Sequence, residues 1–333
     1  MRRCVVMRKM LGICFALFGV LALVGVCQAA EVKIALDSPP DLAKSGTYVW
    51  AKAFGDHLKA NGIAVKEFPQ DALGAEEEKL DQVTQGLLEV SMSDLAKAGQ
   101  LEPSIFGFNL FFVFDSMEHL DRTLQKTDLF KKVNDGTTKK GVRVLSMVAV
   151  GGFGGLANTK KPIQTPEDLK GLRIRAMDKA QAQYIEAWGA NTVIVPWAEI
   201  YNALQTGIAD GYLNPAVVPL LFKHTEVLKH FSDFRYAPPL RLAICSEDWY
   251  KKLTAEQRKI VDEATAKATA ANRAWQIQVD KTGLDDLEKA GTKVVRSTPE
   301  QRAAFAKLVR PVYEKIVGRE VAEAFIKASD ANR

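Results

Sequence analysis

Two arginines on one expected strand have the clearest chemical potential in this sequence. Arg173 and Arg175 alternate with the apolar Leu172 and Ile174. Because side chains of a strand point alternately to its two faces, both guanidinium groups lie on one face. A guanidinium presents a rigid set of donors that matches the oxygens of a carboxylate or sulfonate. Exposed arginine is the common case, however, so the residues alone favour two surface arginines.

The other reactive side chains form no catalytic pattern. The sequence has four histidines, but it lacks a His-Glu-x-x-His motif and a Gly-x-Ser-x-Gly motif. Beyond residue 30 a single cysteine, Cys245, is left, and one thiol forms neither an intramolecular disulfide nor a zinc cage. Its apolar neighbours predict a small buried hydrophobe. We therefore expect no enzyme, no metal and no cofactor.

Residues 1–30 have the layout of a secretory signal peptide. Four basic residues precede an uncharged apolar run over 11–26, and small residues follow. This run of 16 residues is shorter than the roughly 20 that span a bilayer. We expect cleavage after Ala29 or Ala30 and an exported protein. An uncleaved anchor and a lipid attached to Cys27 are the alternatives.

Charge and composition describe a globular protein without a macromolecular footprint. The residues are 47% hydrophobic and 26% charged, which is typical of a globular protein. The length of 333 residues suggests roughly two domains. The formal charge is +5, but residues 1–30 hold four basic and no acidic residues, which leaves 41 basic against 40 acidic residues beyond them. We therefore expect neither nucleic acid nor an anionic membrane surface as a partner.

Short apolar runs alternate with helical patterns, which is typical of an α/β architecture. The runs predict strands over 32–36, 63–68, 89–93, 142–150, 173–176, 192–195, 212–214, 240–245 and 293–295. The apolar periodicity predicts helices over 48–60, 75–85, 117–126, 181–188 and 197–205.

A long helix is expected over residues 254–290. This segment has no proline and is rich in strong helix formers, with Thr254 and Gln257 in the register of a capping box and Gly291 as a terminator. About 37 helical residues would extend for roughly 55 Å, which is longer than a small domain is wide. Such a helix would lie across two lobes. The alternative is a pair of helices broken near Gly283.

Several stretches, taken in order, resemble the DctP-type extracytoplasmic solute-binding subunits of TRAP transporters. The strongest is KPIQTPEDLKGLRIR at 161–175, followed by WGAN at 188–191 and PWAEIYNALQTGIADG at 196–211. FPQDALG at 68–74 and QVTQG at 82–86 are similar to the N-terminal lobe of the family. The resemblance covers residues 31 to 320.

The resemblance implies a two-lobed periplasmic-binding-protein-like α/β fold with interleaved lobes, a central cleft and one long helix spanning both lobes. We expect a signal peptide over 1–30, lobe I over 31–151 plus 240–279, and lobe II over 152–239 plus 280–333. The implied function is a periplasmic, monomeric receptor that captures a small organic anion. It would deliver this anion to the small and large membrane permease subunits.

The resemblance also implies a binding site. The family's arginine at the end of the Gly-Leu-Arg-Ile-Arg strand, here Arg175, forms a salt bridge with the acid group of the substrate. Asn214 matches the family's binding asparagine, although a turn residue before a proline is the alternative. Trp197 occupies the position of an aromatic wall; otherwise it is a staple at a helix start. Asp37 and Asp94 fall where relatives place polar cleft residues, with solvated loop carboxylates as the alternative.

Departures from the family pattern affect the expected ligand. Many members carry an arginine where this sequence has Gly154, and Leu213 replaces a common acidic residue. We expect less polar anchoring and more room at these points, with Phe153 as a further binding residue. Arg241 is a candidate for a second guanidinium. The glycine-rich segment 151–155 lacks the ending of a phosphate-binding loop.

These features leave three ligand classes open. Two arginines and one asparagine suit the three oxygens of a sulfonate such as isethionate or taurine, and they also suit a monocarboxylate. An acidic Asp94 favours a ligand hydroxyl or ammonium group. Extra room favours a bulky aromatic acid. An exported enzyme acting on a small organic acid, or a structural envelope protein, is the alternative to a receptor.

Overall fold

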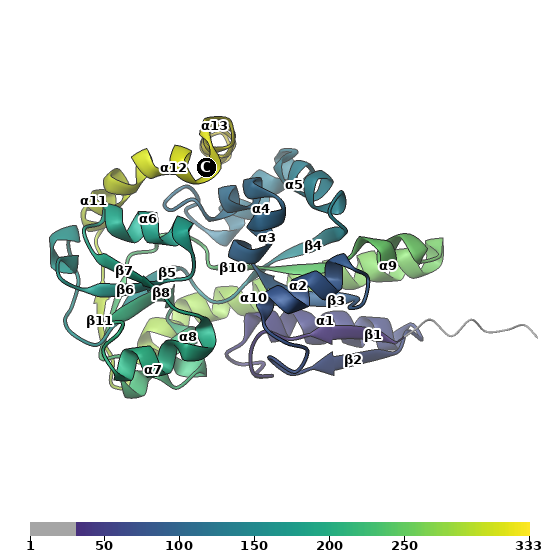
Figure 1. Ribbon diagram of the computed structural model, residues 1–333, viewed down its shortest axis with the longest axis horizontal. Helices are drawn as coiled ribbons and strands as arrows, with labels where there is room; N and C mark the ends of the chain where they lie inside the picture. Colours follow the sequence, from purple (N-terminus) through teal and green to yellow (C-terminus); the bar gives the residue numbers. More distant parts are fainter. Residues whose placement is uncertain (1–30) are drawn as a thin grey trace, which may run out of the picture. The chain divides into compact units, whose positions relative to one another are not determined.

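Two β-sheets form the framework of the protein (Figure 1). The computed structural model describes residues 31–333; the expected signal peptide lies outside the described residues. The first sheet has the order β2-β1-β3-β10-β4. Its strands are β1 (Val32–Ala35), β2 (Val65–Phe68), β3 (Val90–Asp94), β4 (Val142–Ala149) and β10 (Leu240–Ser246). Strands β1, β2 and β3 are parallel, whereas β10 runs antiparallel to both β3 and β4.

The second sheet has six strands in the order β11-β9-β5-β8-β6-β7. These are β5 (Gly154–Asn158), β6 (Arg173–Ala176), β7 (Asn191–Ile194), β8 (Gly211–Pro215), β9 (His230–Asp233) and β11 (Lys293–Arg296). Strand β6 is parallel to β7 and β8, and β5 is antiparallel to β8 and β9. Residues from 240 onward return to the first sheet as β10, so the chain crosses repeatedly between the sheets.

Helices connect the strands of both sheets. Up to residue 138 they are α1 (Gly46–Ala60), α2 (Glu76–Thr84), α3 (Leu95–Leu101), η1 (Pro103–Asn109), α4 (Met117–Lys126) and α5 (Leu129–Thr138). Between β5 and β10 they are η2 (Pro166–Leu169), α6 (Lys179–Ala187), η3 (Trp197–Glu199), α7 (Ile200–Gln205), α8 (Val217–Leu221) and η4 (His224–Glu226). After β10 they are α9 (Glu247–Lys252), α10 (Ala255–Lys289), α11 (Pro299–Val309), η5 (Arg310–Val312), α12 (Tyr313–Val317) and α13 (Arg319–Asp330). This mixed α/β fold confirms the predicted class. No helix within residues 31–333 combines the length and the hydropathy of a membrane span.

The long helix α10 is continuous. It has 35 residues, a length of about 53 Å, and a capping box between Thr254 and Gln257. It packs against β4 of the first sheet and the neighbouring helix α1, and against β11 of the second sheet and helix α8. The alternative break near Gly283 is wrong, because Gly283 lies inside the continuous helix. A Cβ at this position would lie 3.4 Å from the Cβ of Ala216.

One buried amide joins α10 to the first sheet. Asn272 is fully buried, and its amide nitrogen donates to the carbonyl oxygens of Gly46 and Ala149, each at 2.9 Å. Its oxygen accepts from the backbone nitrogen of Ala149 at 2.9 Å and from Arg273 at 2.8 Å. Because all these groups are shielded from water, each needs its partner within the protein. Asn272 therefore fixes where the helix crosses β4 and the start of α1.

Two strands escaped prediction for different reasons. Strand β5 begins with two glycines and has little apolar content, although all five of its residues are buried in the middle of the second sheet. Strand β9 reads His-Phe-Ser-Asp, a polar sequence, yet it is also buried throughout. A hydrogen bond to a neighbouring loop accounts for the burial of one polar residue of this strand. Ser232 accepts from the backbone nitrogen of Ile163 at 3.1 Å.

The last helix packs away from the second sheet. Helix α13 contacts α4 and η1, where Phe325 meets Phe108 edge to face at 4.9 Å between ring centroids and Ser329 donates to the carbonyl of Val113. The sequence-based prediction assigns residues 280–333 together to lobe II, whereas α4 and η1 belong to the range expected for lobe I. The lobe boundaries themselves stay a prediction.

Replacing Asn272 by alanine tests its anchoring role. The variant leaves two buried carbonyls and one buried N–H without their partner, so the free energy of unfolding should fall by about 2–4 kcal/mol. Urea titration of both proteins measures this loss. Gln278→Ala, on an exposed position of the same helix, should change stability by less than about 0.5 kcal/mol. Equal effects of the two substitutions would contradict the role assigned to Asn272.

Candidate functional site

A cavity of about 450 Å³ is lined by residues from both sheets and their loops. Strands β1 and β3 are parallel, and β10 is antiparallel to β3. The carboxyl ends of β1 and β3 and the start of β10 therefore lie at the same end of the strands in the first sheet. This end of the first sheet contributes Asp37, Asp94 and Arg241 to the cavity, and strands β6 and β8 of the second sheet contribute Arg175 and Asn214. The volume is in the range of small-molecule sites.

Arg175 is a buried cation in this cavity. Its residue is only 5% exposed, whereas the side chain of Arg173 on the same strand is 51% exposed. The two share a face as predicted, but Arg173 lies beside Asp210 at the strand start and Arg175 lies at the cavity end. The Arg175 Nε donates to the carbonyl of Val195 at 2.9 Å, and the guanidinium carbon lies 5.7 Å from the ring centroid of Trp197.

The charge of Arg175 has no ion-pair partner among residues 31–333. Burial lowers its pKa to about 10, while Asp94 and Asp178 act in the opposite direction. The group is therefore protonated at neutral pH. Burying a charge without a counter-charge is costly, and its remaining N–H donors face a cavity large enough for an anion.

Arg241, by contrast, is held by carboxylates of the protein. Its guanidinium pairs with Asp37 and with Glu76 of α2. Burial lowers the pKa of Arg241, but Glu76 and Asp37 outweigh burial and raise the pKa overall. The expected role as a second anion-binding guanidinium stays a prediction; in this structure the group orients two carboxylates at the cavity wall.

The two aspartates expected at strand ends are both fixed in place. Asp37 is not a solvated loop residue, because its side chain is only 4% exposed and accepts a 2.7 Å hydrogen bond from the Thr47 hydroxyl. Asp94 caps α3 by accepting from the backbone nitrogen of Lys97 at 2.7 Å. Both residues line the cavity.

Three further candidates have different environments. Trp197 lines the cavity and packs edge to face on Tyr212 and Phe222, with centroids 5.6 and 5.0 Å away. Asn214 lines the cavity from β8. Phe153 is not among the described residues that line it: its ring lies under the guanidinium of Arg235 at 4.5 Å.

The extra room expected near Gly154 is absent. A Cβ on Gly154 would lie 2.3 Å from the ring of Tyr236, which is itself buried. Leu213 is buried in the core and is not among the described residues of the cavity wall, because alternation along β8 turns it away from the face of Asn214. The expectation of room at both positions is therefore wrong: Tyr236 fills one position, and the other faces the core.

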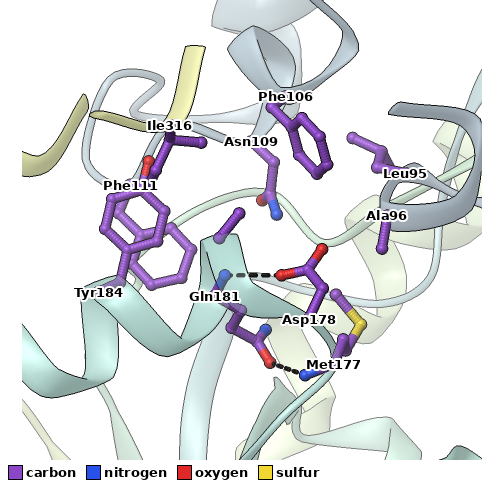
Figure 2. Close-up of a pocket in the computed structure, with 11 residues that line it drawn as sticks. Leu95, Ala96, Phe106, Asn109, Phe111, Met177, Asp178, Gln181, Tyr184 and Ile316 are labelled. Atoms are coloured by element: carbon purple, nitrogen blue, oxygen red, sulfur yellow. Dashed lines mark hydrogen bonds between the residues drawn. The ribbon is translucent and has the colours of Figure 1, made fainter. Parts of the chain in front are cut away.

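Four acidic residues of the cavity lining were missed from the sequence: Asp71, Glu76, Glu77 and Asp178. Glu76 begins α2, and Asp178 caps α6 by accepting from the backbone nitrogen of Gln181 at 2.7 Å. Figure 2 shows Asp178 opposite Ala96, in a small adjoining pocket of about 20 Å³ that shares both residues with the larger cavity. Burial raises the pKa of Asp178. Its place two residues beyond a strand end was the available signal.

Comparisons with known proteins agree with this architecture. The chain is 26% identical over 325 residues to the C4-dicarboxylate-binding periplasmic protein DctP of Rhodobacter capsulatus, which covers 93% of this chain and 94% of the relative. It is 29% identical over 279 residues to the protein of the same name from Vibrio cholerae, covering 81% and 82%. A TRAP periplasmic solute-binding protein from a Polaromonas species, solved with D-erythronate, superposes with a TM-score of 0.80 at 27% identity, covering 89% and 98%.

The fold and the similarity define the class, an extracellular solute-binding protein. Residues 40–320 match the sequence profile of DctP, described as bacterial extracellular solute-binding protein, family 7. Because this match spans most of the chain, the protein belongs to the DctP family. The predicted resemblance is confirmed.

A buried histidine packed against Trp197, His224, should make the folding stability of the protein depend on pH. His224 is 4% exposed, shares a 3.0 Å hydrogen bond between its Nδ1 and the Tyr212 Oη, and lies 5.5 Å from Trp197 between ring centroids. Burial lowers its pKa from 6.5 to about 4, so the neutral ring stabilises the folded protein above pH 6.5. This contribution is lost as the pH falls from about 6.5 to about 4.

Urea unfolding between pH 7.5 and 4 measures this dependence. Stability of the wild type should fall across the window, and His224→Gln should show a smaller fall because its side chain does not titrate. Replacing the partly buried His57 of α1, which does not line the cavity, by glutamine is the control and should leave the wild-type slope in place. A His224→Gln slope equal to that of the wild type would refute the assignment.

Proposed function

We propose that the protein is the periplasmic receptor of a TRAP transporter and captures a small organic acid anion, a carboxylate or a sulfonate. The observation that carries the proposal is the buried, unpaired guanidinium of Arg175 in a cavity lined by both sheets. An acid group of the ligand supplies the counter-charge that residues 31–333 do not. Asn214 donates its amide from the neighbouring strand, and Trp197 packs on the ligand body.

The ligands of relatives support an organic acid. Relatives 26–27% identical to this chain are named for binding 2,3-diketo-L-gulonate or C4-dicarboxylates, and solved ones hold D-erythronate or succinate. All these molecules carry a carboxylate. Each charged hydrogen bond in a closed site contributes about 1.5–3 kcal/mol, so two such bonds and apolar burial approach the roughly 8 kcal/mol of micromolar binding.

A receptor needs no chemistry beyond binding. Within residues 31–333 no group of three metal-ligating side chains is clustered, and Cys245 is a buried thiol whose pKa is raised by burial. We infer that the ligand leaves unchanged and passes to the small and large permease subunits of the membrane. Mass spectrometry of ligand recovered after incubation distinguishes this from an exported enzyme, which would return a converted product.

Substituting Arg175 tests the proposed function. Arg175→Met keeps the apolar stem but removes the charge, so binding should weaken at least about 100-fold. Thermal shift with succinate, D-erythronate, lactate, isethionate and taurine identifies a binder, and titration calorimetry then measures both affinities. At a hundredfold excess over Kd, binding adds about 2.7 kcal/mol to wild-type stability.

Arg173→Met is the matched control, because it removes the same charge from the same strand at an exposed position. It should bind with nearly wild-type affinity. Unchanged affinity in Arg175→Met, or failure of every small acid to stabilise the wild type, would overturn the proposal.

A further inference from the structure

The cavity contains more negative than positive side chains. Its acidic lining residues are Asp37, Asp71, Glu76, Glu77, Asp94 and Asp178. Its basic lining residues are Lys44, Lys97, Arg175 and Arg241. A receptor that simply attracts an anion has no use for such a surplus, since like charges near the ligand oppose its binding.

Most of these charges are already paired within the protein. Arg241 neutralises the pair Asp37 and Glu76 in part, and the buried Lys79 approaches Glu76 to 3.9 Å. At the rim Lys97 pairs with the exposed Glu77 at 2.8 Å. These side chains are balanced by counter-charges of the protein itself. They therefore do not require a charged group on the ligand.

Apart from the exposed Asp71, three lining charges have no ion pair within residues 31–333: Arg175, Asp94 and Asp178. Each aspartate accepts a 2.7 Å hydrogen bond from a backbone nitrogen at a helix start, and no cationic nitrogen of residues 31–333 lies within ion-pair distance of either carboxylate. Both lie close enough to Arg175 to stabilise its charged form, and both line the same cavity. Arg241 is the cross-strand neighbour of Asp94 but is already paired with Asp37 and Glu76. Among the described residues, Arg175 is therefore the one buried cation without an ion pair beside these two anions.

We propose that the ligand is a zwitterion, with its acid group on Arg175 and an ammonium group facing Asp94 and Asp178. This inference rests on the proposed receptor function and narrows its ligand class. A simple anion on Arg175 would leave both carboxylates unbalanced in a desolvated site, which is costly. An ammonium group balances them and donates three charge-assisted hydrogen bonds. The apolar wall formed by Trp197 and Phe222 accommodates the carbon skeleton.

Pairs of ligands that differ in one group test the proposal. Alanine and lactate, taurine and isethionate, and phenylalanine and phenyllactate differ only by an ammonium group in place of a hydroxyl. Calorimetry at pH 7 should show at least one pair whose amino member binds about tenfold more tightly or better, because a charged hydrogen bond exceeds a neutral one by about 1–1.5 kcal/mol.

Asparagine variants of the two aspartates locate the preference. Asparagine caps helices as well as aspartate does, so Asp94→Asn and Asp178→Asn should fold. Each should lose most of the tenfold preference for the amino member while still binding the hydroxy member. Asp128→Asn at the start of α5 makes the same change at an exposed cap beyond the cavity and should keep the preference.

The outcomes separate the two proposals. Tighter binding of a hydroxy acid than of its amino counterpart overturns the zwitterion and leaves the receptor standing. A preference that survives in both asparagine variants also overturns it, because the ammonium group then lies elsewhere. Absence of binding by every acid in the set, amino or hydroxy, counts against the receptor function itself.

Discussion

The burial of one guanidinium governs the design of the site. Arg175 is 95% covered by protein, yet within residues 31–333 only its Nε makes a hydrogen bond, to the carbonyl of Val195. A charge in that position is tolerable when a ligand or trapped water completes its hydrogen bonds. Under the proposed function, an anion on Arg175 would supply these missing partners and stabilise the folded protein. Arg173, two residues away and exposed, shows that the strand itself does not impose this cost.

A rigid framework keeps Arg175, on the second sheet, at a fixed position relative to the cavity residues of the first sheet. Helix α10 packs on both sheets without a break, and Asn272 fixes its crossing point by hydrogen bonds to Gly46 and Ala149. On the first sheet, Arg241 clamps Asp37 and Glu76, so these carboxylates are oriented before any ligand arrives. Preorganised polar groups lose little freedom on binding, which favours affinity and specificity.

The sequence predicted the framework better than the chemistry of the cavity. Capping residues and helix formers were sufficient to predict α10 as a single helix, because such signals are local. The polar strands β5 and β9 were missed, since their burial depends on neighbours distant in sequence. The ion pair between Arg241 and Glu76 was missed for the same reason, because Glu76 lies 165 residues away in the sequence. The room expected at Gly154 was wrong for this reason too, because Tyr236 comes from a remote loop.

Under the zwitterion proposal, the position of Asp94 and Asp178 at helix starts would make the ligand preference easy to change by substitution. A cap accepts one backbone hydrogen bond, and asparagine, serine or threonine performs that task nearly as well as aspartate. A lineage can thus alter the net charge of the chamber by single-residue steps that leave both helices intact. Such substitutions would leave Arg175 and the ion pairs of Arg241 with Asp37 and Glu76 in place, so the acid-binding side of the proposed site would be retained.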